Sequence, residues 1–166
     1  IKKKNLKKIQ NLKKKYTNDL LKSEIKFNPN ILNLFKRLKN KYKIAVATNS
    51  INKTLNLCLT KLKINKIVDF AISTDELNNT KPHPEIYLKC MIKLNSRPSE
   101  TLVLEDSYYG RIAAREANCN LMPIKYTSDV SLKNINKFIK SLNKEKKIQK
   151  KHTWEDDKLN ILIPMA

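Results

Sequence analysis

The stretch TLVLEDSYYG, residues 101–110, combines a strand signal with the start of a helix. Its apolar first half is typical of a strand that is buried on both faces of a parallel sheet. Glu105 and Asp106 follow that run directly, and Ser107 can cap a helix that begins at residue 108. Gly110, the only glycine in the chain, lies in the first turn of that helix, where it permits close approach of the backbone. Two adjacent carboxylates repel each other, so we expect a cation or another partner to stabilise them at this strand end.

The alternation of strand and helix continues on both sides of this stretch. Apolar runs predict further strands at 43–48, 68–74 and 120–126, and helical spacing predicts helices over 51–64, 83–95, 108–118 and 131–144. Upstream, residues 1–25 show the pattern of amphipathic helices, and another helix starts near Asn28 or Asn30. The alternation predicts an α/β fold, a Rossmann-like three-layer sandwich in which helices cover both faces of a parallel sheet.

Composition narrows the class of protein. The chain has 166 residues, room for about one domain, and begins at Ile1, so we expect it to lack its true start. Three cysteines without a CxxC pattern predict free thiols in a reducing cytoplasm, and no apolar run is long enough to span a membrane. The net charge of +20 is compatible with nucleic-acid binding, but the lysines are spread over most predicted helices, which argues against a nucleic-acid partner.

Polar residues gather where three predicted strands end, at 48–50, 74–76 and 105–107. Ligands of open α/β sheets bind beyond the carboxyl ends of the strands. Thr48 and Asn49 can donate hydrogen bonds to a phosphate, Lys81 from a loop can neutralise its charge, and Glu105 with Asp106 offers the oxygen ligands that Mg²⁺ prefers. The alternative is that some of these residues, such as Thr48 or Ser107, only cap the helices that follow.

Three segments resemble motifs of the haloacid dehalogenase-like (HAD) superfamily: VATNS (46–50), TKPHPEIYLKCMIKL (80–94) and RPSETLVLEDSYYGRIAAREAN (97–118). The branch they resemble contains β-phosphoglucomutase and small sugar-phosphate phosphatases, and the resemblance runs over residues 27–143. It implies that Thr48 is the phosphate-binding hydroxyl with Asn49 beside it, and that Lys81 is the lysine of the third motif. Glu105 and Asp106 would be the fourth-motif acids around Mg²⁺, with Asp106 as the direct ligand.

This resemblance implies a Mg²⁺-dependent phosphatase that acts on a small phosphorylated metabolite, such as a sugar phosphate, through an aspartyl-phosphate. Two alternatives stay open: a phosphomutase like β-phosphoglucomutase, and a truncated domain without catalytic activity. The family's first motif, an Asp-x-Asp after an apolar strand, has no counterpart here, and residues 1–26 resemble the end of the helical cap that precedes the second motif. We therefore expect the chain alone to be inactive.

The family places its first strand at the centre of the sheet. Without that strand the core, residues 27–143, would be left with two unpaired edges and would fold poorly, unless the apolar segment NILIPMA (160–166) occupies the vacant position. Two family glycines are also replaced, by Thr80 and by Asn118, and asparagine tolerates the left-handed conformation.

The last part of the chain shows a second resemblance. Residues 144–158 are charged and read as a linker, and LNILIPMA (159–166) is similar to the opening strand of sugar-phosphate nucleotidyltransferases. This pattern predicts a parent protein in which a phosphatase is fused to a nucleotidyltransferase domain.

Overall fold

The computed structural model describes residues 23–149 and 160–164, together with Asn5, Lys8, Ile9, Leu12, Lys15, Tyr16, Asp19 and Leu20. These eight upstream residues have helical backbone and exposed side chains, as expected for an amphipathic helix. Most of the predicted linker and both ends of the chain lie outside the described residues. The assignment of residues 1–26 to a helical cap stays a prediction.

Helices and strands alternate along the chain as the sequence predicts. In order they are α2 (Pro29–Lys39), β1 (Ile44–Ala47), α3 (Asn52–Lys61), β2 (Phe70–Ile72), α4 (Glu85–Leu94), β3 (Thr101–Glu105), α5 (Tyr108–Glu116), β4 (Asn120–Pro123), α6 (Leu132–Gln149) and β5 (Asn160–Pro164). Three short 3-10 helices, η1 (Thr74–Glu76), η2 (Pro98–Glu100) and η3 (Thr127–Asp129), were not predicted. Helix α6 continues past its predicted end at residue 144, because the Lys, Glu and Gln residues that follow favour helix.

Local signals explain where the helices begin and end. The Asn28 side chain accepts a hydrogen bond from the backbone nitrogen of Asn30, and Pro29 occupies the first position of α2, where its missing N–H has no cost. Ser107 caps α5 by accepting from the nitrogen of Gly110 at 3.0 Å. Asn118 has φ 55° after α5, which confirms that an asparagine provides the left-handed residue there.

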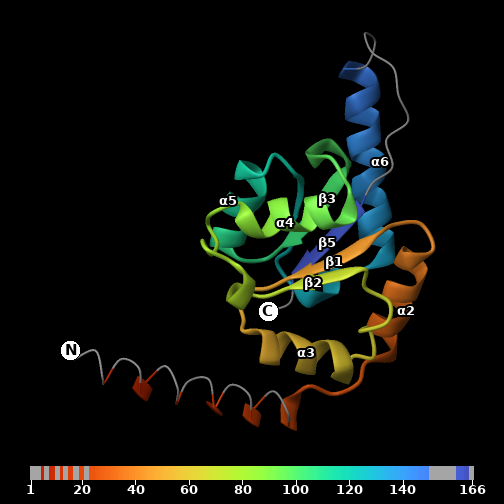
Figure 1. The fold of residues 1–166 in the computed structure, drawn as a ribbon. Coiled ribbons are helices and arrows are strands. Elements are labelled where there is room, and N and C mark those ends of the chain that lie inside the picture. Colours follow the sequence, from red (N-terminus) through yellow and green to blue (C-terminus); the bar gives the residue numbers. More distant parts are fainter. Residues whose placement is uncertain are drawn as a thin grey trace.

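The five strands form one sheet in the order β2-β1-β5-β3-β4, and every pairing is parallel. Helices α2, α3 and α6 cover one face, where they pack on Ile44, Val46, Leu102 and Leu104, and α4 and α5 cover the other face (Figure 1). The predicted α/β three-layer sandwich is therefore confirmed. The carboxyl ends of all strands point to the same edge because the strands are parallel.

Strand β5 lies at the centre of the sheet although it is last in the chain. It pairs with β1 through Ile44↔Ile161 to Ala47↔Pro164 and with β3 through Thr101↔Asn160 to Val103↔Leu162. Ile161 and Ile163 belong to the core under α2, α3 and α6, whereas Leu162 belongs to the core under α4 and α5. Residues 160–164 thus occupy the central position that the sequence offered to the segment NILIPMA, because three consecutive apolar side chains face the two cores in turn at the period of a strand.

Two further sequence-level expectations concern membranes and thiols. No described helix combines the length and the apolar character needed to cross a bilayer. Cys58, Cys90 and Cys119 are free thiols, and burial raises the pKa of Cys90 and of Cys119 to about 12. These thiols are therefore uncharged at neutral pH and act as packing groups.

Candidate active site

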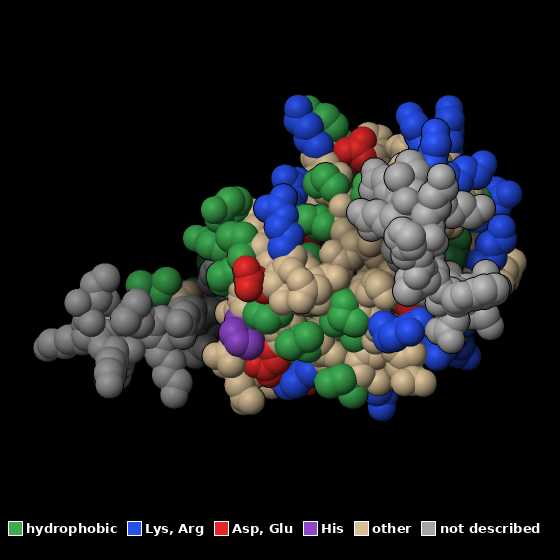
Figure 2. Space-filling view, turned by 90° about the horizontal axis from the view of Figure 1, so that it is seen from above, with side chains coloured by type: hydrophobic (Ala, Val, Ile, Leu, Met, Phe, Trp, Pro, Cys, Tyr) green, Lys and Arg blue, Asp and Glu red, His purple; other side chains and the backbone are tan. Residues whose placement is uncertain are grey.

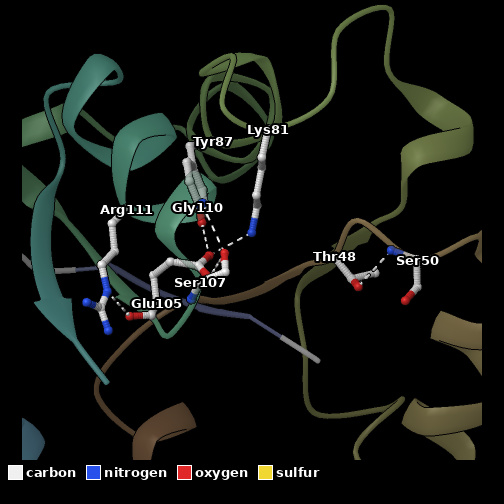
Figure 3. Close-up of polar contacts among 8 residues, drawn as sticks. All are labelled: Thr48, Ser50, Lys81, Tyr87, Glu105, Ser107, Gly110 and Arg111. Atoms are coloured by element: carbon white, nitrogen blue, oxygen red, sulfur yellow. Dashed lines mark hydrogen bonds and ion pairs between the residues drawn. The ribbon is translucent and has the colours of Figure 1, made fainter. Parts of the chain in front are cut away.

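Glu105, the last residue of β3, is fully enclosed by hydrogen-bond donors from three segments of the chain (Figure 3). The Nζ of Lys81 donates to its Oε2 at 2.7 Å, and the hydroxyl of Tyr87 donates to the same oxygen at 2.5 Å. Ser107 donates to Oε1 from its backbone nitrogen at 3.0 Å and from its hydroxyl at 2.8 Å. Only 1% of Glu105 and 8% of Lys81 is exposed, so this is a buried ion pair with its hydrogen bonds satisfied.

The residues around Glu105 favour the charged form of its carboxylate. Burial by itself would raise the pKa of Glu105, but the charge of Lys81 and the hydrogen bonds from Lys81, Tyr87 and Ser107 outweigh burial and hold the pKa below its usual value. Burial, the charge of Glu105 and the hydrogen bond to it raise the pKa of Tyr87. Glu105 is therefore held as a carboxylate in an ion pair with Lys81, and Tyr87 is a neutral donor to it.

Gly110 leaves the space that the Glu105 carboxylate fills. A Cβ on Gly110 would lie 2.1 Å from Cδ of Glu105 and within 2.4 Å of both carboxylate oxygens. The sequence indicated a close approach at this glycine, but to the backbone. The structure corrects this, since it is the carboxylate of the preceding strand that packs against the first turn of α5.

The loop that carries Lys81 is held in place by Glu85, the first residue of α4. The carboxylate of Glu85 accepts from the backbone nitrogens of Asn78 and Asn79 at 2.9 and 2.8 Å. The hydrogen bond from Lys89 and those two nitrogens lower the pKa of Glu85 to about 2. The loop is thus closed by a carboxylate that stays charged, and this fixes the position from which Lys81 reaches Glu105.

Thr48 follows β1, on the opposite side of β5 from the Glu105 cluster (Figure 3). It is 3% exposed, its backbone nitrogen donates to the carbonyl of Ile72 at 3.1 Å, and its Oγ1 accepts from the nitrogen of Ser50 at 3.1 Å. Neither Thr48 nor Ser50 caps α3; instead the nitrogen of Asn52 donates to Asp75 at 2.8 Å. Asn49 is exposed at the same edge of the sheet.

The polar residues 74–76, which follow β2, stabilise the neighbouring loop and helix. Thr74 donates to the carbonyl of Ser50 from both its backbone nitrogen and its hydroxyl, and Asp75 caps α3. Glu76 closes its own 3-10 turn by accepting from the backbone nitrogen of Ser73 at 3.2 Å. Residues 74–76 therefore hold the loop after β1 in place, and they leave Thr48, Asn49, Lys81, Glu105 and Asp106 as the candidate site residues.

A sequence profile described as "Haloacid dehalogenase-like hydrolase" matches residues 1–124, which is most of the chain. The chain belongs to this family. The HAD assignment made from the three sequence motifs is thereby confirmed, and the order of strands and the layers of the sheet agree with it.

Known proteins of this family add detail. The chain is 34% identical over 112 residues to the phosphorylated carbohydrates phosphatase of Thermotoga maritima, covering 67% of this chain and 50% of that protein. It is similar to a HAD hydrolase structure, family IA, from Entamoeba histolytica (TM-score 0.64, 27% identity, 84% of this chain, 73% of that one). It is also similar to β-phosphoglucomutase from Clostridium difficile (TM-score 0.60, 26% identity, 70% and 56%). The chain spans half or less of the length of the curated relatives it matches.

The HAD family implies Mg²⁺, and the described residues can be tested against that ion. Mg²⁺ takes carboxylate and other oxygens in an octahedron. Both oxygens of Glu105 are already occupied by hydrogen bonds, and Asp106 is exposed, with no hydrogen bond or ion pair to any described residue. No group of three His, Cys, Asp or Glu within the described residues could hold a metal ion. Of the two acids only Asp106 has carboxylate oxygens that no described residue contacts, and the assignment of Glu105 and Asp106 to a Mg²⁺ site stays a prediction.

Sequence reasoning missed two residues that contact the candidate site. Tyr87 lies on the face of α4 that is buried against the sheet, and its spacing gives no sign that its hydroxyl reaches Glu105. Arg111 anchors the end of β3 by donating to the carbonyl of Ile124 at 2.7 Å and to that of Glu105 at 3.3 Å. The contacts of Tyr87 with Glu105 and of Arg111 with Ile124 join residues 18 and 13 positions apart, so only the packing of α4 and α5 on the sheet reveals them.

Proposed function

We propose that this chain supplies the phosphate-binding part of a HAD-type phosphatase that acts on a small phosphorylated metabolite, with a sugar phosphate as the substrate. The reaction would transfer the phosphoryl group from the sugar ester to the aspartate of the family's first motif, which has no counterpart in this sequence, and release the sugar as its alcohol. Water would then attack the aspartyl-phosphate and release inorganic phosphate. Thr48 and Asn49 would donate to the phosphoryl oxygens, and Lys81 would balance negative charge at the edge of the sheet. The similarity to a carbohydrate phosphatase supports this substrate class.

One observation carries the proposal. The buried ion pair of Lys81 and Glu105 lies on one side of β5, and the buried Thr48 lies on the other side, at the same edge of the sheet. The chain also belongs to the HAD family. A buried, fully satisfied ion pair costs free energy to desolvate and is weak evidence for stability alone. Its position beside a strand end that also presents a hydroxyl and an amide suits an anionic ligand.

Ligand binding tests the proposal without turnover. Glucose 6-phosphate and glucose are titrated separately into the chain by isothermal calorimetry. We expect measurable affinity for the phosphorylated sugar only. Replacing Thr48 by Val keeps the shape but removes the hydroxyl, and a lost hydrogen bond to a charged group predicts about tenfold weaker binding. Thr60→Val, on the exposed side of α3, is the matched control and should bind as the unmodified chain does.

Two outcomes would contradict the proposal. Equal affinity for glucose and glucose 6-phosphate would show that no phosphate site exists at this edge. Equal weakening by Thr48→Val and by Thr60→Val would place the site elsewhere. A separate turnover measurement on the longest available form of the protein distinguishes the phosphatase from the phosphomutase. Transfer of the phosphoryl group between two hydroxyls of one sugar, detected by ³¹P NMR, would favour a phosphomutase, in line with the similarity to β-phosphoglucomutase.

A second candidate is a domain of the same fold without catalytic activity. The state of Glu105 favours it, because a carboxylate bound by Lys81, Tyr87 and Ser107 has no oxygen left for a metal. Such a domain could still bind a phosphorylated ligand through Thr48. The two candidates differ in turnover, which phosphate release from the longest available form of the protein would measure. The fusion to a nucleotidyltransferase stays a prediction.

A further inference from the structure

The two helical layers of the sheet differ in charge. Neither α2 nor α3 contains an acidic residue, and α6 has none from Leu132 to Lys144, although all three helices carry basic residues. On the opposite face, α4 and α5 carry Glu85 and Glu116 beside their basic residues, and Glu85 pairs with Lys89 at 2.9 Å. The excess positive charge of these helices is therefore concentrated on one face of the molecule.

Helix α6 carries the most regular part of this charge. Lys133, Lys137, Lys140 and Lys144 are separated by four, three and four residues, so they share one side of the helix. All four are exposed, and none of them forms an ion pair with a described residue. Ile135 and Ile139 point the opposite way, into the core. The four lysines form a row about 16 Å long at 1.5 Å per residue.

A groove lies between α2 and the segment that leads into α6. It is a cavity of about 630 Å³ lined by residues of α2 and its cap, by Thr127 and Ser128 of η3, and by residues 130–132. Its polar lining consists of Asn28, Asn30, Asn33, Arg37, Thr127, Ser128 and Ser131. Arg37 is exposed and forms no ion pair with a described residue. The lining is thus rich in hydrogen-bond donors and contains no carboxylate.

Some negative charge does lie near these helices, because Glu145 follows the lysine row within α6 and Asp69 and Asp129 lie close to α2 and α6. Asp69 forms an ion pair with Lys39. Asp129 accepts hydrogen bonds from the backbone nitrogens of Lys125 and Tyr126, which lower its pKa. Lys and Arg side chains gather at the right-hand end of Figure 2, the side on which Figure 1 places α6 and α2.

We propose that this basic face, formed by the lysine row of α6 and the groove beside α2, binds the phosphodiester backbone of a single-stranded nucleic acid. A row of cations with adjacent Asn, Ser and Thr donors suits repeated phosphates and sugars, and such contacts carry no sequence preference. An anionic membrane is a poorer match. Membrane-surface helices need exposed apolar side chains next to the cations, and the large exposed apolar residues of the described chain lie outside α2, α3 and α6.

This inference reverses one argument made from the sequence. The lysines looked spread along the chain because α4 and α5, which cover the other face, lie between α3 and α6 in the sequence. Folding brings α2, α3 and α6 to the same face and removes α4 and α5 to the other. The proposal is independent of the phosphatase site, which lies at the edge of the sheet rather than on the helical layer.

Fluorescence anisotropy with a labelled 20-nucleotide single-stranded RNA tests the proposal on the full chain. The first variant replaces Lys137, Lys140 and Lys144 by Gln. The matched control replaces Lys89, Lys93 and Arg115 by Gln, which removes the same charge from the opposite face. Lys89 is an exposed partner of Glu85, so its loss costs little stability.

We expect the first variant to bind at least tenfold more weakly than the unmodified chain at 50 mM salt. We also expect the slope of log affinity against log salt concentration to become shallower by about 2, because each phosphate contact of a single strand contributes about 0.7. The affinity of the control variant for the RNA should stay within threefold of that of the unmodified chain.

Three results would overturn the proposal. One is the absence of RNA binding at low salt. Another is equal loss in both variants, which would mean that total charge rather than this face decides. The third is binding to phosphatidylglycerol vesicles that excess RNA does not displace, which would assign the face to a membrane.

Discussion

Replacing the only glycine of the chain by alanine tests the packing of the Glu105 cluster. In Gly110→Ala the new Cβ would lie 2.1 Å from Cδ of Glu105, far inside van der Waals contact. Alanine is favoured over glycine in a helix by about 1 kcal/mol. Without the close contact, the substitution would therefore stabilise α5. We expect it to destabilise the protein instead.

The expected magnitude follows from what must move. The Glu105 carboxylate is held by Lys81, Tyr87 and Ser107, so it cannot turn away without loss of those bonds. Losing one hydrogen bond to a charged group costs about 1.5–3 kcal/mol, and forcing an extra methyl group into a packed site costs about 1–3 kcal/mol. After the gain of about 1 kcal/mol in helix propensity is subtracted from these costs, Gly110→Ala should lower the free energy of unfolding by about 2–4 kcal/mol.

Urea denaturation followed by circular dichroism measures this effect in two backgrounds. In the double variant Glu105→Ala, Lys81→Met, the obstructing carboxylate and its buried partner are both absent, and Gly110→Ala should be neutral or stabilising. In Glu105→Gln, where the shape is kept and the charge is lost, the cost should persist. The effect of Gly110→Ala on the free energy of unfolding is compared between the first background and the unmodified chain. The difference between the two effects measures the coupling of Gly110 to the Glu105–Lys81 pair.

Equal destabilisation by Gly110→Ala in all backgrounds would refute this reasoning. That result would mean that alanine disturbs the helix or its cap, independently of the carboxylate. Stabilisation in the unmodified chain would show that Glu105 moves freely, which is incompatible with a carboxylate fixed by four hydrogen bonds.

Two further predictions concern stability. Leu162→Ala in β5 should lower the free energy of unfolding, measured by urea denaturation, by about 2–5 kcal/mol, because Leu162 is fully buried. The control Ile92→Ala, at a residue 80% exposed, should change it by less than about 0.5 kcal/mol. Equal effects would mean that β5 does not pack in the sheet. The Glu105 contribution should be complete above its ordinary pKa of 4.5 and be lost as pH falls through the lower folded value. The melting temperature should therefore drop more steeply below pH 4.5 in the unmodified chain than in Glu105→Gln, and parallel pH profiles would contradict the assigned ion pair.

Much of the fold could be predicted because its signals are local. The run TLVLE is apolar over residues 102–104 and becomes β3, and the helical spacing after it becomes α5 with Ser107 as its cap. Asn28 and Pro29 mark the start of α2 in the same way. The 3-10 helices were missed because their turns depend on single hydrogen bonds, such as that of Glu76 to the backbone of Ser73.

The site could be predicted only as a set of residues at strand ends. Parallel strands place their carboxyl ends at one edge, so the sequence was sufficient to bring Thr48, Asn49, Lys81, Glu105 and Asp106 to that edge as candidates. It could not show that Asp75 caps α3 while Thr48 does not, because caps of this kind come from another segment. The roles of the candidate residues stay predictions.

The sequence by itself determined the alternation of strands and helices, and with it the parallel sheet and the family, because periodicity and motif spacing are properties of neighbouring residues. The tertiary structure decided three things that depend on contacts between distant segments. It placed β5 between β1 and β3, where Ile161 and Leu162 face opposite cores. It engaged Glu105 with Lys81 and Tyr87. It also gathered the basic helices on one face, because a three-layer fold sorts elements by the side of the sheet they cover, regardless of their order in the chain.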